Sequence, residues 1–127
     1  MKICKFFLTI FTAILFISCA EEGVNPASPD GNMPPQQPSN PLPANDSLDV
    51  SLTPTLTWEC SDADGDNLTY YVYFGTDTLF LVSSEQNENF YIPDTLQPNT
   101  DYYWGIAVLD KYEYYAWSDL WHFKTTF

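Results

Sequence analysis

The stretch that decides the fold is residues 96–108, which read LQPNTDYYWGIAV. Its first half contains Pro98 and Asn99, residue types that favour a tight corner in the backbone. Its second half alternates between two sides, as a half-buried β-strand does. The inward side carries Tyr102, Trp104, Ile106 and Val108. Because a buried tyrosine hydroxyl needs a hydrogen-bond partner, the stretch predicts a corner that leads directly into a core strand.

The same alternation extends over the chain after Pro43. It is clear at residues 55–60, 68–74 and 101–108, and weaker at 46–52, 78–83, 89–92 and 117–126. No apolar pattern here has the 3.6-residue period of a helix. Seven short strands separated by Pro, Gly, Asn and Asp predict an all-β, antiparallel sandwich. The inward positions should form its core: Leu56, Trp58, Tyr70, Val72, Phe74, Leu96, Trp104, Ile106, Val108 and Phe123.

These residues resemble a known family. The segment LQPNTDY matches the L-x-P-x-T-x-Y signature of fibronectin type III domains at Leu96, Pro98, Thr100 and Tyr102. Trp58 lies where that family has its core tryptophan, and residues 123–125 resemble its closing strand. The resemblance covers residues 44–127. It implies a seven-stranded, immunoglobulin-like sandwich in which the Tyr102 hydroxyl bonds to the backbone near the corner, the arrangement called a tyrosine corner.

Residues 1–18 have the order of a secretory signal peptide: two lysines, an apolar run and a small-residue processing site. The run FFLTIFTAILFI is too short to cross a bilayer as a helix, which needs about 20 residues. Residues 16–19, Phe-Ile-Ser-Cys, resemble the lipobox of bacterial lipoproteins, which implies that Cys19 becomes the lipidated first residue. The alternative is an ordinary cleaved signal peptide with an incidental cysteine.

Residues 19–43 comprise this cysteine and a proline-rich stretch with almost no large apolar side chain. Such a stretch buries too little surface to offset its ordering entropy, so it predicts a disordered linker in front of the domain at 44–127. The AEEG after Cys19 resembles the acidic export tags of some Bacteroidetes surface lipoproteins. That resemblance implies an outer-membrane lipoprotein exposed at the cell surface, with the periplasmic face as the alternative.

The net charge is −13, from four basic and 17 acidic residues. Removal of the signal peptide takes away Lys2 and Lys5 and leaves a net charge of −15. A surface of this sign repels phosphate backbones, which excludes nucleic acid as a partner. Membrane contact is therefore expected through the lipid alone. Cys4 is removed with the signal peptide and Cys19 carries the lipid, so Cys60 has no cysteine to pair with and is expected to be a small buried apolar residue.

The segment SDADGDN, residues 61–67, places Asp62, Asp64 and Asp66 at every second position. It joins two predicted strands, and its glycine position does not match an EF-hand loop. One interpretation is a turn, because Asp, Asn and Gly accept left-handed backbone angles and cap their own loop. The other is that the three carboxylates converge on one Ca²⁺ ion. The sequence predicts no other cofactor.

Aromatic residues form the second candidate site. Tyr71, Tyr73 and Tyr103 alternate with core residues and should point away from the core. The loop before the last strand adds Tyr112, Tyr114, Tyr115 and Trp117. Such side chains on one sheet and its adjacent loop could stack on a sugar or enter a protein interface. The alternative is that the rings cover one another, as cross-strand aromatic pairs do.

Catalysis finds little support in the sequence. His122 is the sole histidine, and no Ser or Cys nucleophile with a matched base can be assembled around it. Three tripeptides resemble the acceptor of Bacteroidetes O-glycosylation: residues 46–48, 77–79 and 94–96. The sequence therefore predicts a non-enzymatic envelope lipoprotein whose sandwich module binds a protein or a glycan. The alternatives are a passive spacer or accessory subunit of an envelope complex, and a glycan-binding accessory of a polysaccharide uptake system.

Overall fold

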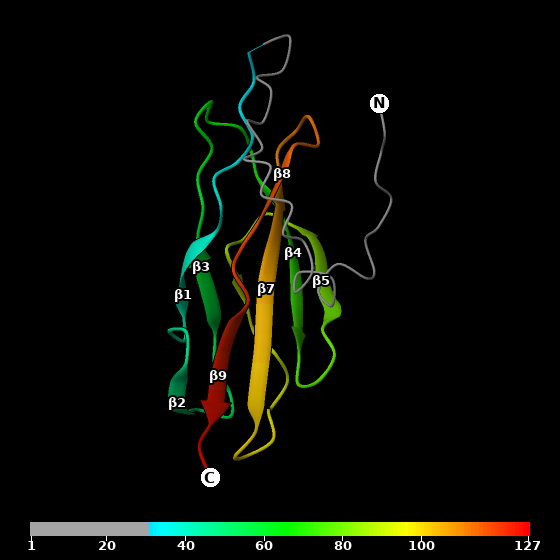
Figure 1. Ribbon diagram of the computed structural model, residues 1–127. Helices are drawn as coiled ribbons and strands as arrows, with labels where there is room; N and C mark the ends of the chain where they lie inside the picture. The colour runs from blue at the N-terminus through cyan, green and yellow to red at the C-terminus, as the bar shows by residue number, and fades with distance from the viewer. Residues whose placement is uncertain (1–30) are drawn as a thin grey trace.

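The computed structural model describes residues 31–127, which form nine strands in two sheets (Figure 1). The smaller sheet has the order β1-β3-β6, with β1 at Ser39–Leu42, β3 at Leu56–Glu59 and β6 at Phe90–Tyr91. The larger sheet has the order β2-β9-β7-β4-β5, and β8 also pairs with β7. Its strands are β2 (Ser47–Val50), β4 (Thr69–Gly75), β5 (Phe80–Gln86), β7 (Asp101–Leu109), β8 (Tyr115–Trp117) and β9 (Trp121–Thr125). Within this range no helix is long and apolar enough to cross a membrane.

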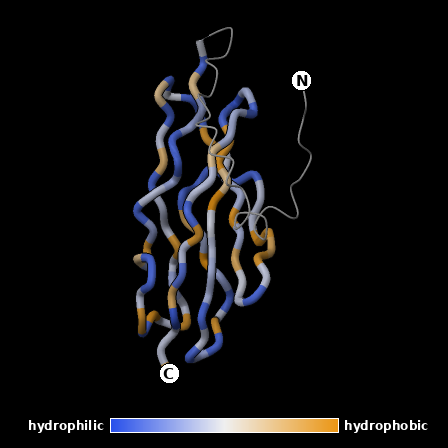
Figure 2. Tube along the Cα trace, viewed as in Figure 1, coloured by the Kyte–Doolittle hydropathy of each residue, from blue (hydrophilic) through white to orange (hydrophobic). Residues whose placement is uncertain are grey.

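The core lies between the two sheets, where inward-facing side chains meet. All ten residues that the sequence assigns to the core are buried. Along β4 and β9 every second residue is buried. Figure 2 shows hydrophobic positions on strands of both sheets. Trp121 and Tyr102 complete the core, and the Trp121 ring meets the Trp104 ring edge-on at 4.6 Å. The predicted all-β sandwich is confirmed.

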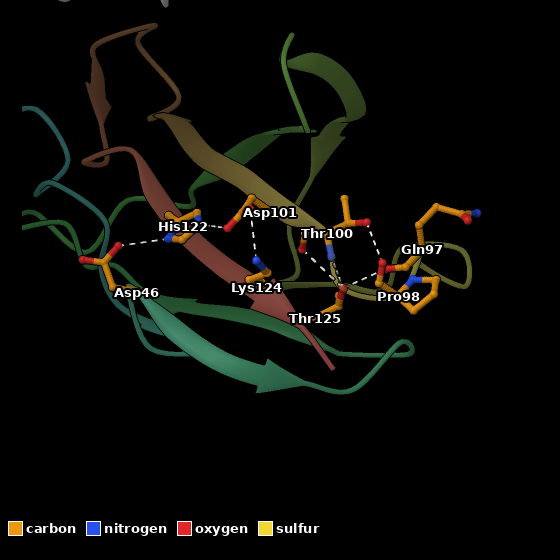
Figure 3. Close-up of polar contacts among 8 residues, drawn as sticks. All are labelled: Asp46, Gln97, Pro98, Thr100, Asp101, His122, Lys124 and Thr125. Atoms are coloured by element: carbon orange, nitrogen blue, oxygen red, sulfur yellow. Dashed lines mark hydrogen bonds and ion pairs between the residues drawn. The ribbon is translucent and has the colours of Figure 1, made fainter. Parts of the chain in front are cut away.

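The corner before β7 is held by side-chain hydroxyl groups. The Gln97 amide donates to the Tyr102 hydroxyl oxygen at 3.0 Å, which confirms the predicted tyrosine corner. The Thr100 hydroxyl donates to the Pro98 carbonyl at 2.8 Å. From β9, the Thr125 hydroxyl donates to the Gln97 carbonyl at 2.7 Å and accepts from the Thr100 amide at 2.9 Å (Figure 3). The last strand thereby fixes the same corner from the other side.

His122 fastens the edge of the larger sheet. Its Nδ1 atom lies 3.0 Å from Asp46, just before β2, and its Nε2 atom lies 2.9 Å from Asp101 at the start of β7 (Figure 3). Asp101 also faces Lys124 at 3.8 Å. Carboxylates thus occupy both ring nitrogens of His122. The side chain joins β2, β9 and β7, which is a structural role.

Two expectations about the strands need correction. Residues 39–42, assigned by the sequence to a disordered linker, form β1, which pairs antiparallel with β3. A proline has no amide to donate and is tolerated there because β1 is an edge strand. The predicted domain boundary at residue 44 is therefore too late. The predicted signal peptide, Cys19 and residues 20–30 lie outside the described residues.

The second correction concerns the direction and number of the strands. β2 pairs parallel with β9, so the sandwich is not purely antiparallel. The number of strands also differs from the prediction. β1 is an additional strand, and the segment expected to form one strand at residues 117–126 is divided between β8 and β9. Ser118 separates them, and its hydroxyl accepts a hydrogen bond from the Ile106 amide of β7 at 2.8 Å.

Candidate functional site

The outer surface of the larger sheet carries five aromatic side chains, which we call the aromatic face: Tyr71, Tyr73, Tyr103, Tyr115 and Trp117. Strand pairing places them together. Tyr71 and Tyr73 alternate with the buried residues of β4 and so point outward, as predicted. Tyr103 follows the buried Tyr102 in β7, and its ring lies 4.9 Å from the His122 ring. In β8, Tyr115 and Trp117 point outward while Ala116 packs on the core.

Small residues of β7 shape the middle of the aromatic face. Gly105 lies opposite Tyr73 in the register, and Ala107 lies between Tyr71 and Trp117. Because these two positions offer little side chain, the rings of Tyr73 and Trp117 approach across β7 to a centroid distance of 5.5 Å. For this pair the rings do cover each other. Tyr103 and Tyr115 remain 37% and 61% exposed.

Carboxylates flank the aromatic face. The pKa of Tyr71 is raised, mainly by burial of its hydroxyl and further by the negative charges of Glu85 and Glu113. Burial also raises the pKa of Tyr73, with a smaller contribution from Tyr71. The face therefore combines rings with anionic hydrogen-bond acceptors at its edge. Such a surface can stack on an apolar ring face while its carboxylates accept from hydroxyl groups.

The remaining tyrosines of the predicted cluster lie elsewhere. Tyr112 and Tyr114 belong to the turn between β7 and β8, whose first residue, Asp110, accepts hydrogen bonds from both of their amides. The Lys111 ammonium group lies 4.8 Å from the centre of the Tyr112 ring. Tyr112 also lines a hollow of about 240 Å³ together with Asp64 and Asp66. The predicted aromatic cluster is therefore divided between a sheet face and a loop.

The aspartate loop is a turn that Asp62 caps. Its Oδ1 atom accepts from the Asp64 amide at 2.8 Å and from the Asp66 amide at 3.2 Å. Gly65 has a φ angle of 73°, which glycine adopts without strain. Asp64 turns away and accepts from the Met33 amide at 2.6 Å. The three aspartates of the loop therefore do not converge, contrary to the calcium interpretation as the sequence posed it.

A different set of carboxylates does converge. One oxygen from each of Asp62, Asp66 and Asp110 lies within 4.8 Å of the others. Asp110, which is 5% exposed, was missed by sequence reasoning because it lies 44 residues after Asp66. One signal in the sequence could have indicated Asp110. It begins a second turn between two strands, and this turn lies at the same end of the sandwich as the aspartate loop. In the group of carboxylates that converge, Asp110 takes the place that the sequence interpretation gave to Asp64.

Comparisons with known proteins bear on the fold. No known protein family and no curated protein matches the chain in sequence. Among solved structures, the PKD domain of an M14-like peptidase from Thermoplasmatales archaeon SCGC AB-540-F20 matches with a TM-score of 0.54 at 21% identity, covering 76% of this chain and 99% of that one. An Fn3-like protein from Clostridium thermocellum matches with a TM-score of 0.53 at 17% identity, covering 73% and 95%. The fold is fibronectin type III-like.

Surface positions of the fibronectin type III-like domain bear on the predicted glycosylation. In two of the three acceptor tripeptides the hydroxyl residue, Thr78 or Thr95, is exposed. In the third, Ser47 lies in β2, and its hydroxyl donates to the Ala44 carbonyl at 2.6 Å. Thr78 and Thr95 are therefore the accessible positions of the three, and glycosylation at them stays a prediction.

Cys60 of the fibronectin type III-like domain is expected to react slowly with thiol reagents. Its thiol donates to the Gln36 carbonyl at 3.1 Å, and burial raises its pKa from 9.0 to about 11. Since the thiolate is the nucleophile, this lowers the reactive fraction at pH 8 about 100-fold. Because the folded state holds the proton, the contribution to stability is complete below about pH 9 and is lost as the pH rises to about 11.

Reaction with Ellman's reagent measures this directly on residues 20–127, where Cys60 is the single cysteine. The native rate should be far below the rate in guanidinium chloride. Equal rates would show that the thiol is open to solvent and reactive.

Proposed function

We propose that this chain is a non-enzymatic binding module of the bacterial cell envelope whose aromatic face binds a glycan. The single observation that carries the proposal is the gathering of five aromatic side chains on one outer sheet surface, with Tyr115 61% exposed. The likeness to a PKD domain and to an Fn3-like protein supports a binding or spacer module rather than an enzyme. The signal-peptide pattern and Cys19 support anchoring of the module to the outer membrane by lipid, at the cell surface or on its periplasmic face.

The chemistry of the face favours a glycan over a protein. Protein interfaces are enriched in tyrosine and tryptophan but depleted of Glu and Asp at their centres. Here the negative charges of Glu85 and Glu113 lie near enough to Tyr71 to add to the rise in its pKa. Sugar hydroxyl groups can donate to such carboxylates while the apolar face of the ring stacks on an aromatic side chain. The strongly acidic chain remains unsuited to nucleic acid.

A glycan array probed with residues 20–127 tests the proposal. The variant Tyr71→Ser/Tyr115→Ser removes two rings of the aromatic face. It is expected to bind its glycans about tenfold to a hundredfold more weakly, because each lost stacking contact contributes roughly 0.5–1.5 kcal/mol beyond its buried area. Phe90→Ser is the matched control, since Phe90 is 45% exposed but lies in β6 of the other sheet. Equal losses in both variants would contradict the proposed site.

The second candidate is a spacer or accessory subunit. The contact between Tyr73 and Trp117 favours it, because rings that cover each other need no ligand. If the wild-type chain binds no glycan on the array, the result favours the spacer or accessory role over glycan binding. If it binds only an envelope protein, and Tyr71→Ser/Tyr115→Ser abolishes that binding, the face is a protein interface instead.

A further inference from the structure

Three carboxylates meet at the end of the sandwich opposite the C-terminus. We call Asp62, Asp66 and Asp110 the acidic pole; the first two belong to the β3–β4 loop and the third to the β7–β8 turn. Figure 1 shows both segments at this end of the molecule. The two turns are built alike, because Asp62 and Asp110 each use Oδ1 to cap the amides of their own loop. Each loop is therefore ordered by one oxygen of its aspartate.

Two oxygens of the acidic pole are buried without a hydrogen-bond partner among residues 31–127. The Asp66 side chain is 7% exposed, and its Oδ1 atom pairs with Lys111 at 2.7 Å, whereas its Oδ2 atom has no partner in the described part of the chain. The Oδ2 atom of Asp62 is also inaccessible to solvent and has no hydrogen-bond partner among the residues that the structure describes. A buried acceptor left unpaired is costly, and native proteins contain few of them. Two such atoms within one group of three carboxylates point to a cation ligand.

We propose that Asp62, Asp66 and Asp110 bind one Ca²⁺ ion. Ca²⁺ is held by oxygen ligands at about 2.3–2.6 Å, so two ligand atoms of one ion lie at most about twice that distance apart. The three carboxylate oxygens meet this condition, because they lie within 4.8 Å of one another. The three carboxylates carry three negative charges and Lys111 supplies one positive charge. The two negative charges that remain are neutralised by one divalent cation. The hollow of about 240 Å³ beside Asp66 admits water for the remaining coordination positions.

The ion would also fasten the N-terminal segment, residues 31–38. Asn32, 7% exposed, donates from its side-chain amide to Oδ2 of Asp110 at 2.8 Å. The Met33 amide donates to Asp64 at 2.6 Å, and the Gln36 amide donates to the Ser61 carbonyl at 2.9 Å. The segment is thus bonded to both loops that the ion joins. Calcium binding therefore sets how residues 31–38 join the domain.

Calorimetric titration of EDTA-treated residues 20–127 with CaCl₂ tests the site. One ion per chain should bind with a Kd of roughly 10⁻⁴–10⁻³ M, the range of extracellular calcium modules. At calcium tenfold above this Kd, the Tm should rise by about 5–10 °C. MgCl₂ at equal concentration should do much less, because Mg²⁺ needs a tighter octahedral shell. No binding and no change in Tm at millimolar CaCl₂ would overturn the proposal.

Conservative variants test the residue set. Asp66→Asn and Asp110→Asn each keep one of the two oxygen acceptors and remove a charge, and each should weaken calcium binding at least about tenfold. Asp64→Asn is the matched control: it lies in the same loop but outside the acidic pole, so its calcium affinity should stay within about threefold of the wild type. A loss for Asp64→Asn as large as for Asp66→Asn would overturn this assignment.

Amide hydrogen exchange tests the fastening. In the wild-type chain, calcium should slow exchange at Met33 and Gln36 by about tenfold or more, because the loops that accept from these amides become fixed. Amides of β5, on the far edge of the larger sheet, provide the internal reference. Calcium binding with unchanged exchange at Met33 and Gln36 would overturn the proposed effect on the N-terminal segment.

Discussion

Replacing Trp58 by alanine is expected to lower the free energy of unfolding by about 3–5 kcal/mol. Trp58 lies in β3 of the smaller sheet and is 1% exposed. Its ring meets Tyr70 edge-on at 5.3 Å and lies 6.4 Å from Trp104, and both of these belong to the larger sheet. Alanine would leave a cavity between two sheets whose strands are held in register by their backbone bonds. Urea denaturation measures the loss.

Two variants separate the cavity from other effects. Trp58→Phe should cost less than half as much, because it keeps an aromatic ring in place and the indole Nε1 atom has no hydrogen-bond partner within residues 31–127. Phe90→Ala, at a 45% exposed position of the same sheet, should cost less than about 1 kcal/mol. An unchanged denaturation midpoint for Trp58→Ala would contradict the central place of this residue in the core.

The core could be predicted from the sequence because alternation is a local pattern. Tyr70, Val72 and Phe74 occupy every second position, and burial of such a row determines the register of its strand. Trp121 was missed because Asp119 and Leu120, both exposed, interrupt the alternation before β9. Its burial follows from packing against Trp104, which depends on the pairing of β9 with β7.

The first strand could not be predicted for a related reason. Residues 39–42 read SNPL, and their proline and asparagine argue locally for a linker. Their structure comes from β3, whose edge they pair with, and from the burial of Pro38 behind it. Tertiary contacts therefore override local propensity here, as they often do in edge strands.

The candidate sites divide in the same way. The outward direction of Tyr71 and Tyr73 follows from alternation within one strand, so the sequence predicted it. Convergence of Asp110 with Asp66 depends on which loops meet at one end of the sandwich. Sequence spacing instead favoured Asp64, which the fold directs toward Met33. A chemical site assembled from two loops needs the topology before its residues can be named.

Replacing Thr125 by valine is expected to cost about 1–3 kcal/mol, the second of the large effects on stability. Thr125 is 2% exposed, and its hydroxyl serves the Gln97 carbonyl and the Thr100 amide together. Valine has nearly the same shape, so the loss comes from these two partly buried groups left unpaired. A change below about 0.5 kcal/mol in urea denaturation would show that water or a shifted corner satisfies them.

A double-mutant cycle with Tyr102→Phe tests whether the corner acts as a unit. The Tyr102 hydroxyl accepts a hydrogen bond from the Gln97 amide, whereas the Thr125 hydroxyl of β9 donates one to the Gln97 carbonyl. When one hydroxyl is removed, the corner can shift and weaken the bond made by the other. The two losses should therefore fail to add, with an interaction energy of about 0.5 kcal/mol or more. Simple additivity would mean that β9 and the tyrosine corner stabilise the domain independently, and that the L-x-P-x-T-x-Y segment folds without help from the last strand.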